Sequence, residues 1–259
     1  MDTVDLSLSR FLFPPIHREG VRFVLIAGGI ALVAHSLFIW LSHPFIALLF
    51  WLLPACVYYF FRDPERVPPL DADAVVSPAD GTVCLLAQVP IPEQLGLALN
   101  PIVWRISIFM NMLNVHVNRM PAEGTITKMH YVPGEIINAS LDKASESNER
   151  QLYLMTAESG HQLAFVQIAG LVARRIVAFA KEGQKLARAE RFGLIRFGSR
   201  VDVYLPQGVE PSVRLGQTMV AGESIIARLT KPLEPKALVD TTTLEEDIAR
   251  LTKLLEPKT

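Results

Sequence analysis

The sequence predicts a mainly β protein, in which a barrel-like or sandwich-like domain follows an N-terminal hydrophobic helical hairpin and precedes a short C-terminal helix. Three observations support this prediction. Short segments with alternating apolar side chains recur between about residues 62 and 230, separated by turn-forming residues. Two long apolar runs precede these segments, and one capped amphipathic segment follows them. We therefore expect three parts, at residues 1–61, 62–230 and 231–259.

Composition excludes several classes of protein. Of the 259 residues, 50% are hydrophobic and 20% are charged, which is unlike a disordered chain. The formal net charge is −1, so the chain lacks the basic excess of a nucleic-acid-binding protein, and we expect no nucleic-acid partner. Two cysteines cannot build a disulfide framework, and no motif with metal-ligand spacing occurs, so we expect no metal.

The N-terminal hairpin is expected from two apolar runs. Phe23–Leu41 has 19 residues and Phe45–Phe61 has 17, and only Ser42, His43 and Pro44 separate them. As helices they would reach about 28 Å and about 25 Å. A bilayer core is about 30 Å thick, so the first run is long enough to span it and the second is marginal. A buried core hairpin is the alternative, and a pair that re-enters the same leaflet is equally compatible with these lengths.

The positive charges around the hairpin predict its orientation. Arg10, Arg18 and Arg22 precede it, Arg62 and Arg66 follow it, and the connector carries no Lys or Arg. Because basic flanks stay on the cytoplasmic side, both ends are expected there. We therefore expect a protein on the cytoplasmic face of the cell membrane.

The strands of the central part are expected from alternation and β-branched residues. The expected strands are Trp104–Met110, Gln151–Met155 and Gln162–Ile168 with a turn at 158–160 between them, Leu171–Phe179, and a strand with Val201, Val203 and Leu205 on one face. Pro206 would end the last strand.

The C-terminal helix is expected from its capping pattern. Thr243 and Glu246 have the spacing of a capping box. Four apolar residues then share one helical face: Leu244, Ile248, Leu251 and Leu255. We interpret this segment as a packing or partner helix.

The chemistry is indicated by Arg196–Arg200, with the sequence RFGSR, ahead of the strand that ends at Pro206. This segment resembles the self-cleavage site of the phosphatidylserine decarboxylase family, in its short bacterial branch with a Gly-Ser junction. Four further stretches match that family in order: Phe61–Arg66 (FRDPER), Ser77–Gly81 (SPADG), Asn114–Pro121 (NVHVNRMP) and Asn148–Arg150 (NER). The resemblance covers about residues 60–206, and the hydrophobic hairpin also fits it.

The resemblance implies a proenzyme that makes its own cofactor. The Ser199 hydroxyl would attack the Gly198 carbonyl, and elimination would cut the chain and leave a pyruvoyl group at position 199. Residues 1–198 would become the membrane-bound large subunit and residues 199–259 the small one. The pyruvoyl group would form a Schiff base with phosphatidylserine, a membrane phospholipid, and CO₂ would leave to give phosphatidylethanolamine. The oligomeric state is left open, a homo-oligomer included.

Two residues of the matching motifs are candidates for activating Ser199, which is a weak nucleophile unless a base lies within hydrogen-bond reach. Asp80 matches the aspartate that the family uses in self-cleavage, and on its own it would be interpreted as a turn-capping carboxylate. His116 is a candidate for the cut and for delivering the proton that replaces CO₂. The family's longer branch has a second histidine three residues later, where this chain has Arg119.

The substrate's anionic groups call for cationic contacts. The candidates are Arg119, Arg150, Arg196 and Arg200. The carboxylate itself should not meet a strong ion pair, because stabilising it in the ground state raises the barrier to losing it. We therefore expect apolar walls around it.

Two other functions remain open from the sequence. A membrane hairpin with a β-rich domain is also compatible with a non-enzymatic adaptor or carrier module of barrel-sandwich type. A pyruvoyl enzyme for a soluble amino acid is the third hypothesis, and the hydrophobic hairpin argues against it.

Overall fold

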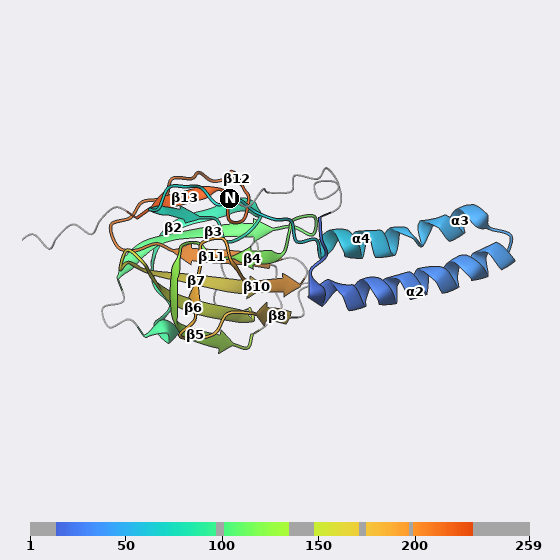
Figure 1. The fold of residues 1–259 in the computed structure, drawn as a ribbon, viewed down its shortest axis with the longest axis horizontal. Helices are drawn as coiled ribbons and strands as arrows, with labels where there is room; N and C mark the ends of the chain where they lie inside the picture. Colours follow the sequence, from blue (N-terminus) through green and yellow to red (C-terminus); the bar gives the residue numbers. More distant parts are fainter. Residues whose placement is uncertain (1–13, 97–100, 135–147, 171–174, 197–198, 230–259) are drawn as a thin grey trace, which may run out of the picture. The chain divides into compact units, whose positions relative to one another are not determined.

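The computed structural model describes residues 14–96, 101–134, 148–170, 175–196 and 199–229. Strands dominate this part of the chain, which confirms the prediction of a mainly β protein with an apolar helical segment at its N-terminal end (Figure 1). The helix expected between Thr243 and Leu255 lies outside the described residues and stays a prediction, as does the division at residues 230 and 231.

The hairpin consists of three helices. They are α2 (Arg18–Trp40), α3 (Pro44–Leu49) and α4 (Leu52–Phe60), and α2 packs along both of the others (Figure 1). The second apolar run was expected as one helix, and this was wrong, because the helix is interrupted at Phe50 and Trp51. Pro54 is the physical reason. It has no N–H to donate to the carbonyl of Phe50, and its ring clashes with that carbonyl in a regular helix.

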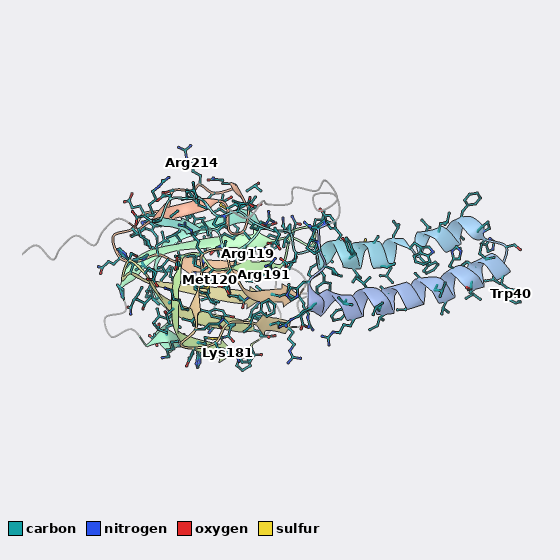
Figure 2. The ribbon with its side chains drawn as sticks, viewed as in Figure 1. Trp40, Arg119, Met120, Lys181, Arg191 and Arg214 are labelled. Carbon is teal, nitrogen blue, oxygen red and sulfur yellow. The ribbon has the colours of Figure 1, made fainter. Side chains whose placement is uncertain are left out.

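The hairpin leaves its apolar side chains exposed. Leu25 and Val33 on α2 are each 70% exposed, and Phe45 on α3 is 83% exposed. Trp40, at the far end of α2, is 79% exposed (Figure 2). The helix α2 is long and apolar enough to cross a membrane, whereas Pro44–Phe60 is shorter. A core hairpin of a soluble domain would bury these side chains, so their exposure favours a lipid environment.

Most strands belong to one curled antiparallel sheet of eight, in the order β12-β2-β3-β11-β7-β6-β5-β9. Its strands are β2 (Gly81–Pro90), β3 (Ile102–Met110), β5 (Gly124–Val132), β6 (Arg150–Ala157), β7 (Gln162–Ala169), β9 (Lys185–Leu186), β11 (Ser199–Tyr204) and β12 (Thr218–Met219). A second sheet has the order β4-β10-β8, with β4 (Val117–Arg119), β10 (Arg191–Arg196) and β8 (Arg175–Ala178). The strands β1 (Ala74–Val76) and β13 (Ile225–Arg228) pair separately.

The strands expected from alternation are present. The segments 104–110, 151–155 and 162–168 lie within β3, β6 and β7, and β6 and β7 form a hairpin as expected. Val201, Val203 and Leu205 share the main core as predicted, and the strand β11 ends just before Leu205. The strand expected at Leu171–Phe179 is confirmed as β8 from residue 175, and residues 171–174 lie outside the described part.

The strand β11 occupies the centre of the large sheet, hydrogen-bonded to β3 on one side and β7 on the other. Its side chains alternate between two apolar layers. Val201 and Val203 join the main core with residues of the second sheet, such as Phe192 of β10. Tyr204 faces the opposite layer together with Leu152 of β6. Since both faces are covered, this strand is buried throughout.

A third apolar cluster joins the hairpin to the small sheet. It contains Phe60 and Phe61 from the end of α4, with Val117 of β4 and Leu194 of β10. Phe23 of α2 stacks on Phe61, with 5.3 Å between ring centroids. The base of the hairpin is therefore packed directly against the strands that lead to residue 199.

Gly81 provides a test of the sheet at a point where two strands approach closely. Its φ is +151°, and a Cβ there would lie 2.2 Å from the carbonyl oxygen of Phe109 in β3. Gly81→Ala should therefore lower the free energy of unfolding by about 2 kcal/mol or more. Gly160→Ala is the matched control, because its φ is also positive but its Cβ would meet no atom within 4 Å, so its cost should stay near 1 kcal/mol. Thermal unfolding followed by circular dichroism would measure both, and equal costs would contradict this account.

Candidate active site

Ser199 is the first residue of β11 and is completely buried. Its partners in the sheet are Met110 of β3 and Ala169 of β7. The Ser199 hydroxyl donates a weak hydrogen bond to Met110 Sδ at 3.9 Å. Gly198, the other residue of the expected cut, lies outside the described residues. The nucleophile expected from the sequence is thus anchored at one end of a central, buried strand.

A chain of buried polar groups leads to the same sulfur atom. The hydroxyl of Tyr153 donates to Gln167 Oε1 at 2.7 Å, and Gln167 Nε2 donates to Asn118 Oδ1 at 2.8 Å. Asn118 Nδ2 then donates to Met110 Sδ at 3.6 Å. Burial raises the pKa of Tyr153, so its hydroxyl stays protonated and remains a donor. This chain holds Met110 in place beside Ser199.

His116 lies just before β4, and strand pairing brings it near the cut. Its carbonyl accepts the N–H of Ile195 in β10, at 3.3 Å, and Ile195 precedes Ser199 by four residues in the sequence. The imidazole is completely buried and lies against Phe60 of α4, with 4.2 Å between ring centroids. The position of His116 is therefore fixed from two sides, by the small sheet and by the end of the hairpin.

The hydrogen bonds of His116 define its tautomer. Nδ1 lies 2.9 Å from the carbonyl oxygen of Asn114, which can only accept, so Nδ1 carries the proton. Nε2 is then an acceptor, and it is buried with no hydrogen-bond partner among the residues that the structure describes. Burial lowers the pKa of His116 to about 4, the bond to Asn114 opposes this, and Arg62 adds to the lowering. At neutral pH His116 is therefore an uncharged base with an available lone pair.

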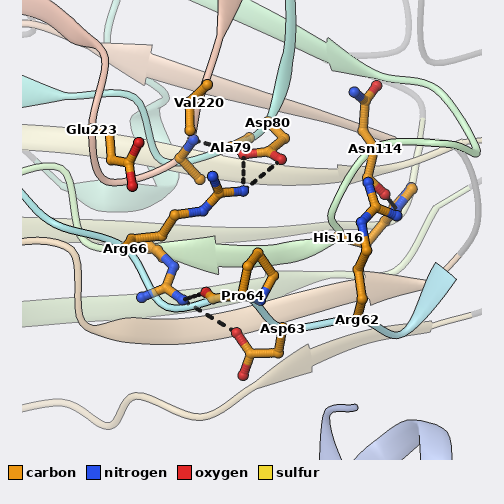
Figure 3. A network of polar contacts seen from close by, with 12 residues as sticks. Arg62, Asp63, Pro64, Arg66, Ala79, Asp80, Asn114, His116, Val220 and Glu223 are labelled. Carbon is orange, nitrogen blue, oxygen red and sulfur yellow. Dashed lines mark hydrogen bonds and ion pairs between the residues drawn. The ribbon is translucent and has the colours of Figure 1, made fainter. Parts of the chain in front are cut away.

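Asp80 makes a different set of contacts. Arg66 Nη2 donates to both of its carboxylate oxygens, at 2.8 and 3.1 Å, and the backbone N–H of Ala221 donates to Oδ1 at 2.7 Å. Figure 3 shows Asp80 directed towards Arg66, whereas His116 lies beside Asn114 and Arg62. Within the described residues, no hydrogen bond joins Asp80 to His116 or Ser199. The geometry thus favours an anchoring carboxylate here.

Two of the candidate arginines have protein partners inside the domain. Arg119 forms an ion pair with Asp63 at 3.2 Å and donates to the backbone carbonyls of Ala189 and Pro64. Arg200 is completely buried and pairs with Asp202 at 2.8 Å. It points to the side of β11 away from Ser199, because neighbouring residues of a strand face opposite sides.

The other two candidate arginines line separate cavities. Arg150 lines a cavity of about 320 Å³ together with Asp202 and Tyr204, on the face of β11 away from Ser199. Arg196 lines a cavity of about 390 Å³ at the junction of α2 with β8 and β10. The second cavity lies at the strand end that leads to the cut.

The structure adds residues to which sequence analysis assigned no role in the site. Phe60 covers the imidazole of His116, and Arg66 neutralises Asp80. Both fall in or next to the stretch Phe61–Arg66, so the matching motif was a signal that could have been followed. Arg22 and Arg175, which line the cavity of Arg196, carried no such signal, because they lie outside every matching stretch.

Comparisons with known proteins identify relatives along most of the chain. The family model described as phosphatidylserine decarboxylase matches residues 53–227. A protein of Cereibacter sphaeroides is 50% identical over 86% of this chain and 93% of its own length. A protein of Gluconacetobacter diazotrophicus is 51% identical over 86% of this chain and 98% of its own length. A protein of Ruegeria pomeroyi is 50% identical over 83% of this chain and 95% of its own length. All three are named phosphatidylserine decarboxylase proenzyme.

The lowered pKa of His116 has a measurable consequence for stability. Below pH 6.5 the unfolded chain takes up a proton at this residue, and the folded chain does not until about pH 4. The free energy of unfolding should therefore decrease as the pH is lowered through this window. From this group alone the decrease is about 2 kcal/mol between pH 7 and pH 5. In the His116→Gln variant, the free energy of unfolding should decrease by about 2 kcal/mol less over the same pH interval. Thermal unfolding of both chains at pH 7 and pH 5 would measure it, and identical pH dependences would contradict a buried neutral imidazole.

Proposed function

Because the chain belongs to the phosphatidylserine decarboxylase family, a family of pyruvoyl-dependent decarboxylases made as proenzymes, we propose that it cuts itself between Gly198 and Ser199. Ser199 would become the pyruvoyl group, and the mature enzyme would convert phosphatidylserine to phosphatidylethanolamine. The observation that carries this proposal is the position of Ser199. It is buried at the start of β11 and follows, by four residues, Ile195 of β10, whose N–H donates to the carbonyl of His116.

The proposed cut proceeds in three steps. The Ser199 oxygen attacks the Gly198 carbonyl carbon, and its proton passes through a base to the nitrogen of residue 199. The amide C–N bond then breaks to leave an ester and a free amine. Removal of the Cα proton of residue 199 then breaks the Cβ–O bond. The carboxylate of Gly198 departs, and dehydroalanine remains at 199. Addition of water and loss of ammonia leave the pyruvoyl group at the start of residues 199–259.

His116 is the base that the geometry favours. Its Nε2 lone pair is buried, unprotonated at neutral pH and directed at no described partner. Among the described acceptors, the Ser199 hydroxyl meets only the sulfur of Met110, at 3.9 Å, and such a bond is weak. The base needs such a hydroxyl within hydrogen-bond reach.

The surroundings of Ser199 fit a pyruvoyl group. When present, this group supplies a carbonyl that withdraws electrons from the amine-bearing carbon as CO₂ leaves. Met110 and Phe60 provide apolar surface near Ser199 and His116, respectively, as expected for a site that must not stabilise the substrate carboxylate. His116, which is held by Asn114, would deliver the proton that replaces CO₂.

Asp80 is assigned a positioning role. Its two bonds to Arg66 and one from Ala221 fasten the turn Ser77–Gly81. The next strand, β2, begins in that turn and borders β3, which carries Met110. The carboxylate thereby supports the row of strands against which Ser199 lies.

The hairpin is proposed to hold the enzyme at the cytoplasmic face of the membrane. The exposed apolar side chains of α2, α3 and α4 support insertion, and the flanking arginines support the orientation. A diacyl phospholipid stays in the bilayer, so a tethered active site meets it at a high effective concentration.

Intact-mass analysis of the purified protein tests the proposed cut. It should show two chains, residues 1–198 and 199–259, with the smaller one lacking a free N-terminal amine. Ser199→Ala should stay a single chain and release no CO₂ from phosphatidylserine. A wild-type chain that stays whole would instead support the adaptor hypothesis, and activity on free serine in place of the lipid would support the soluble-substrate enzyme.

The roles of His116 and Asp80 are separable by rates of self-cleavage. His116→Gln should slow the cut by about 10² to 10⁴-fold, because it removes the base. Asp80→Asn and Arg66→Gln should slow it by a smaller and similar factor, about tenfold, because each breaks the same ion pair. Time courses on denaturing gels give the rates, and Tm values show whether each variant is folded. A far larger effect of Asp80→Asn than of Arg66→Gln would make Asp80 the base.

A further inference from the structure

The cavity of about 390 Å³ at the base of the hairpin has an unusual lining. It is bordered by the start of α2 through Glu19 and Arg22, by the whole of β8 (Arg175–Ala178), and by the end of β10 through Arg196. Three guanidinium groups therefore line the cavity with a single carboxylate, that of Glu19, which pairs with Arg196 at 2.8 Å and with Arg22 at 3.8 Å. The lining keeps an excess of positive charge, and its space is large enough for a small anionic group. We call the set Arg22, Arg175 and Arg196 the arginine cradle.

The fold positions the cradle through specific contacts. Arg196 donates to Glu19 at 2.8 Å, and its guanidinium carbon lies 5.2 Å from the ring centre of Phe23. Arg22 lies over the same ring at 4.9 Å. Arg175 is the register partner of Arg196 across β8 and β10, so both side chains leave the same face of the small sheet.

Arg196 retains unused hydrogen-bonding capacity. Its side chain is only 12% exposed, and its Nε is buried with no acceptor among the residues that the structure describes. A buried donor without an acceptor is costly unless a ligand or water satisfies it. Arg175 is exposed and Arg22 is 60% exposed, so the cavity remains open to an incoming group.

The cradle lies between the membrane anchor and the cut. Arg196 is three residues before Ser199, so their Cα atoms are at most about 11 Å apart. Glu19 and Arg22 lie at the start of α2, where the apolar run of the hairpin begins. If the hairpin enters a bilayer, this level is that of the lipid head groups.

We propose that the arginine cradle binds the phosphodiester of the substrate phospholipid and so places its amine at residue 199. This inference rests on the proposed function and adds the site that holds the head group. In phosphatidylserine one methylene carbon separates the phosphate ester oxygen from the carbon that bears the amine, so the phosphate must sit close to residue 199. Planar guanidinium groups match phosphate oxygens in charge and geometry.

The reaction explains why arginines belong at the phosphodiester. The substrate carboxylate loses its charge as CO₂ departs, so a cation on it would stabilise the ground state and slow the step. The phosphodiester keeps its charge throughout, so binding it helps substrate and transition state equally and lowers KM without raising the barrier. The other candidate arginines fit less well, because Arg119 and Arg200 are buried in ion pairs with Asp63 and Asp202 and do not line this cavity, and Arg150 lies on the opposite face of β11.

The test uses Arg175→Gln and Arg22→Gln, alone and together, in the full chain. In the uncut Ser199→Ala background, each single variant should weaken the binding of dihexanoyl phosphatidylserine in neutral detergent about tenfold, measured by calorimetry. In the processed enzyme KM should rise by a similar factor while kcat changes little. Arg214→Gln is the matched control, an exposed arginine on a distant loop (Figure 2), and should change neither quantity.

Several outcomes would overturn the assignment. Unchanged lipid binding in the double variant would exclude the cradle as the phosphodiester site. Weaker sedimentation with phosphatidylglycerol vesicles, together with unchanged binding of dihexanoyl phosphatidylserine, would make it a general contact with anionic membranes instead. A denaturing gel identifies variants that fail to split. A wild-type chain that neither splits nor releases CO₂ would count against the proposed function, and the calorimetry on Ser199→Ala would still decide the cradle.

Discussion

One buried carboxylate connects the parts of the molecule that must work together. Asp63 follows directly after the hairpin and pairs with Arg119 of β4 at 3.2 Å and with Arg191 of β10 at 2.7 Å. Its backbone N–H also donates to the carbonyl of Pro15, ahead of α2. These contacts tie both ends of the hairpin to the two strands that border His116 and the cut. Breaking a buried pair by removing one partner is expensive, since the remaining charge stays buried. The base of the hairpin and the candidate site therefore behave as one unit.

This network also accounts for Arg119. The longer branch of the family has a histidine at this position, and the sequence alone left the consequence open. In the fold the side chain points to Asp63 and to the carbonyls of Ala189 and Pro64. A short histidine could not reach all three of these acceptors. Arg119 therefore has a structural role in this chain, and His116 is the histidine of its motif to which we assign the role of base as a proposal.

The sequence predicted what local patterns determine. Alternation located β3, β6 and β7, and the apolar runs located the hairpin, because these signals depend on neighbouring residues. Ser199, Asp80 and His116 came from motif resemblance. The break at Phe50 and Trp51 was not predicted, because we interpreted the run from its apolar composition alone. Pro54, which has no N–H for a helical hydrogen bond, was the signal that could have predicted it. The meeting of Arg22 with Arg175 could not be predicted, because it depends on the approach of α2 to β8, which are far apart in the sequence.

The place of Ser199 also bears on how two chains would stay together after a cut. The strand β11 hydrogen-bonds along its whole length to β3 and to β7, which both belong to the larger fragment. Further along the smaller fragment, β12 pairs with β2 and β13 pairs with β1. Val201, Val203 and Ile226 are buried in the shared core. Cutting the chain at the start of a central strand removes one covalent link and leaves these ladders and this apolar contact intact. A new chain end can therefore form inside the domain while the surrounding sheet holds it between β3 and β7.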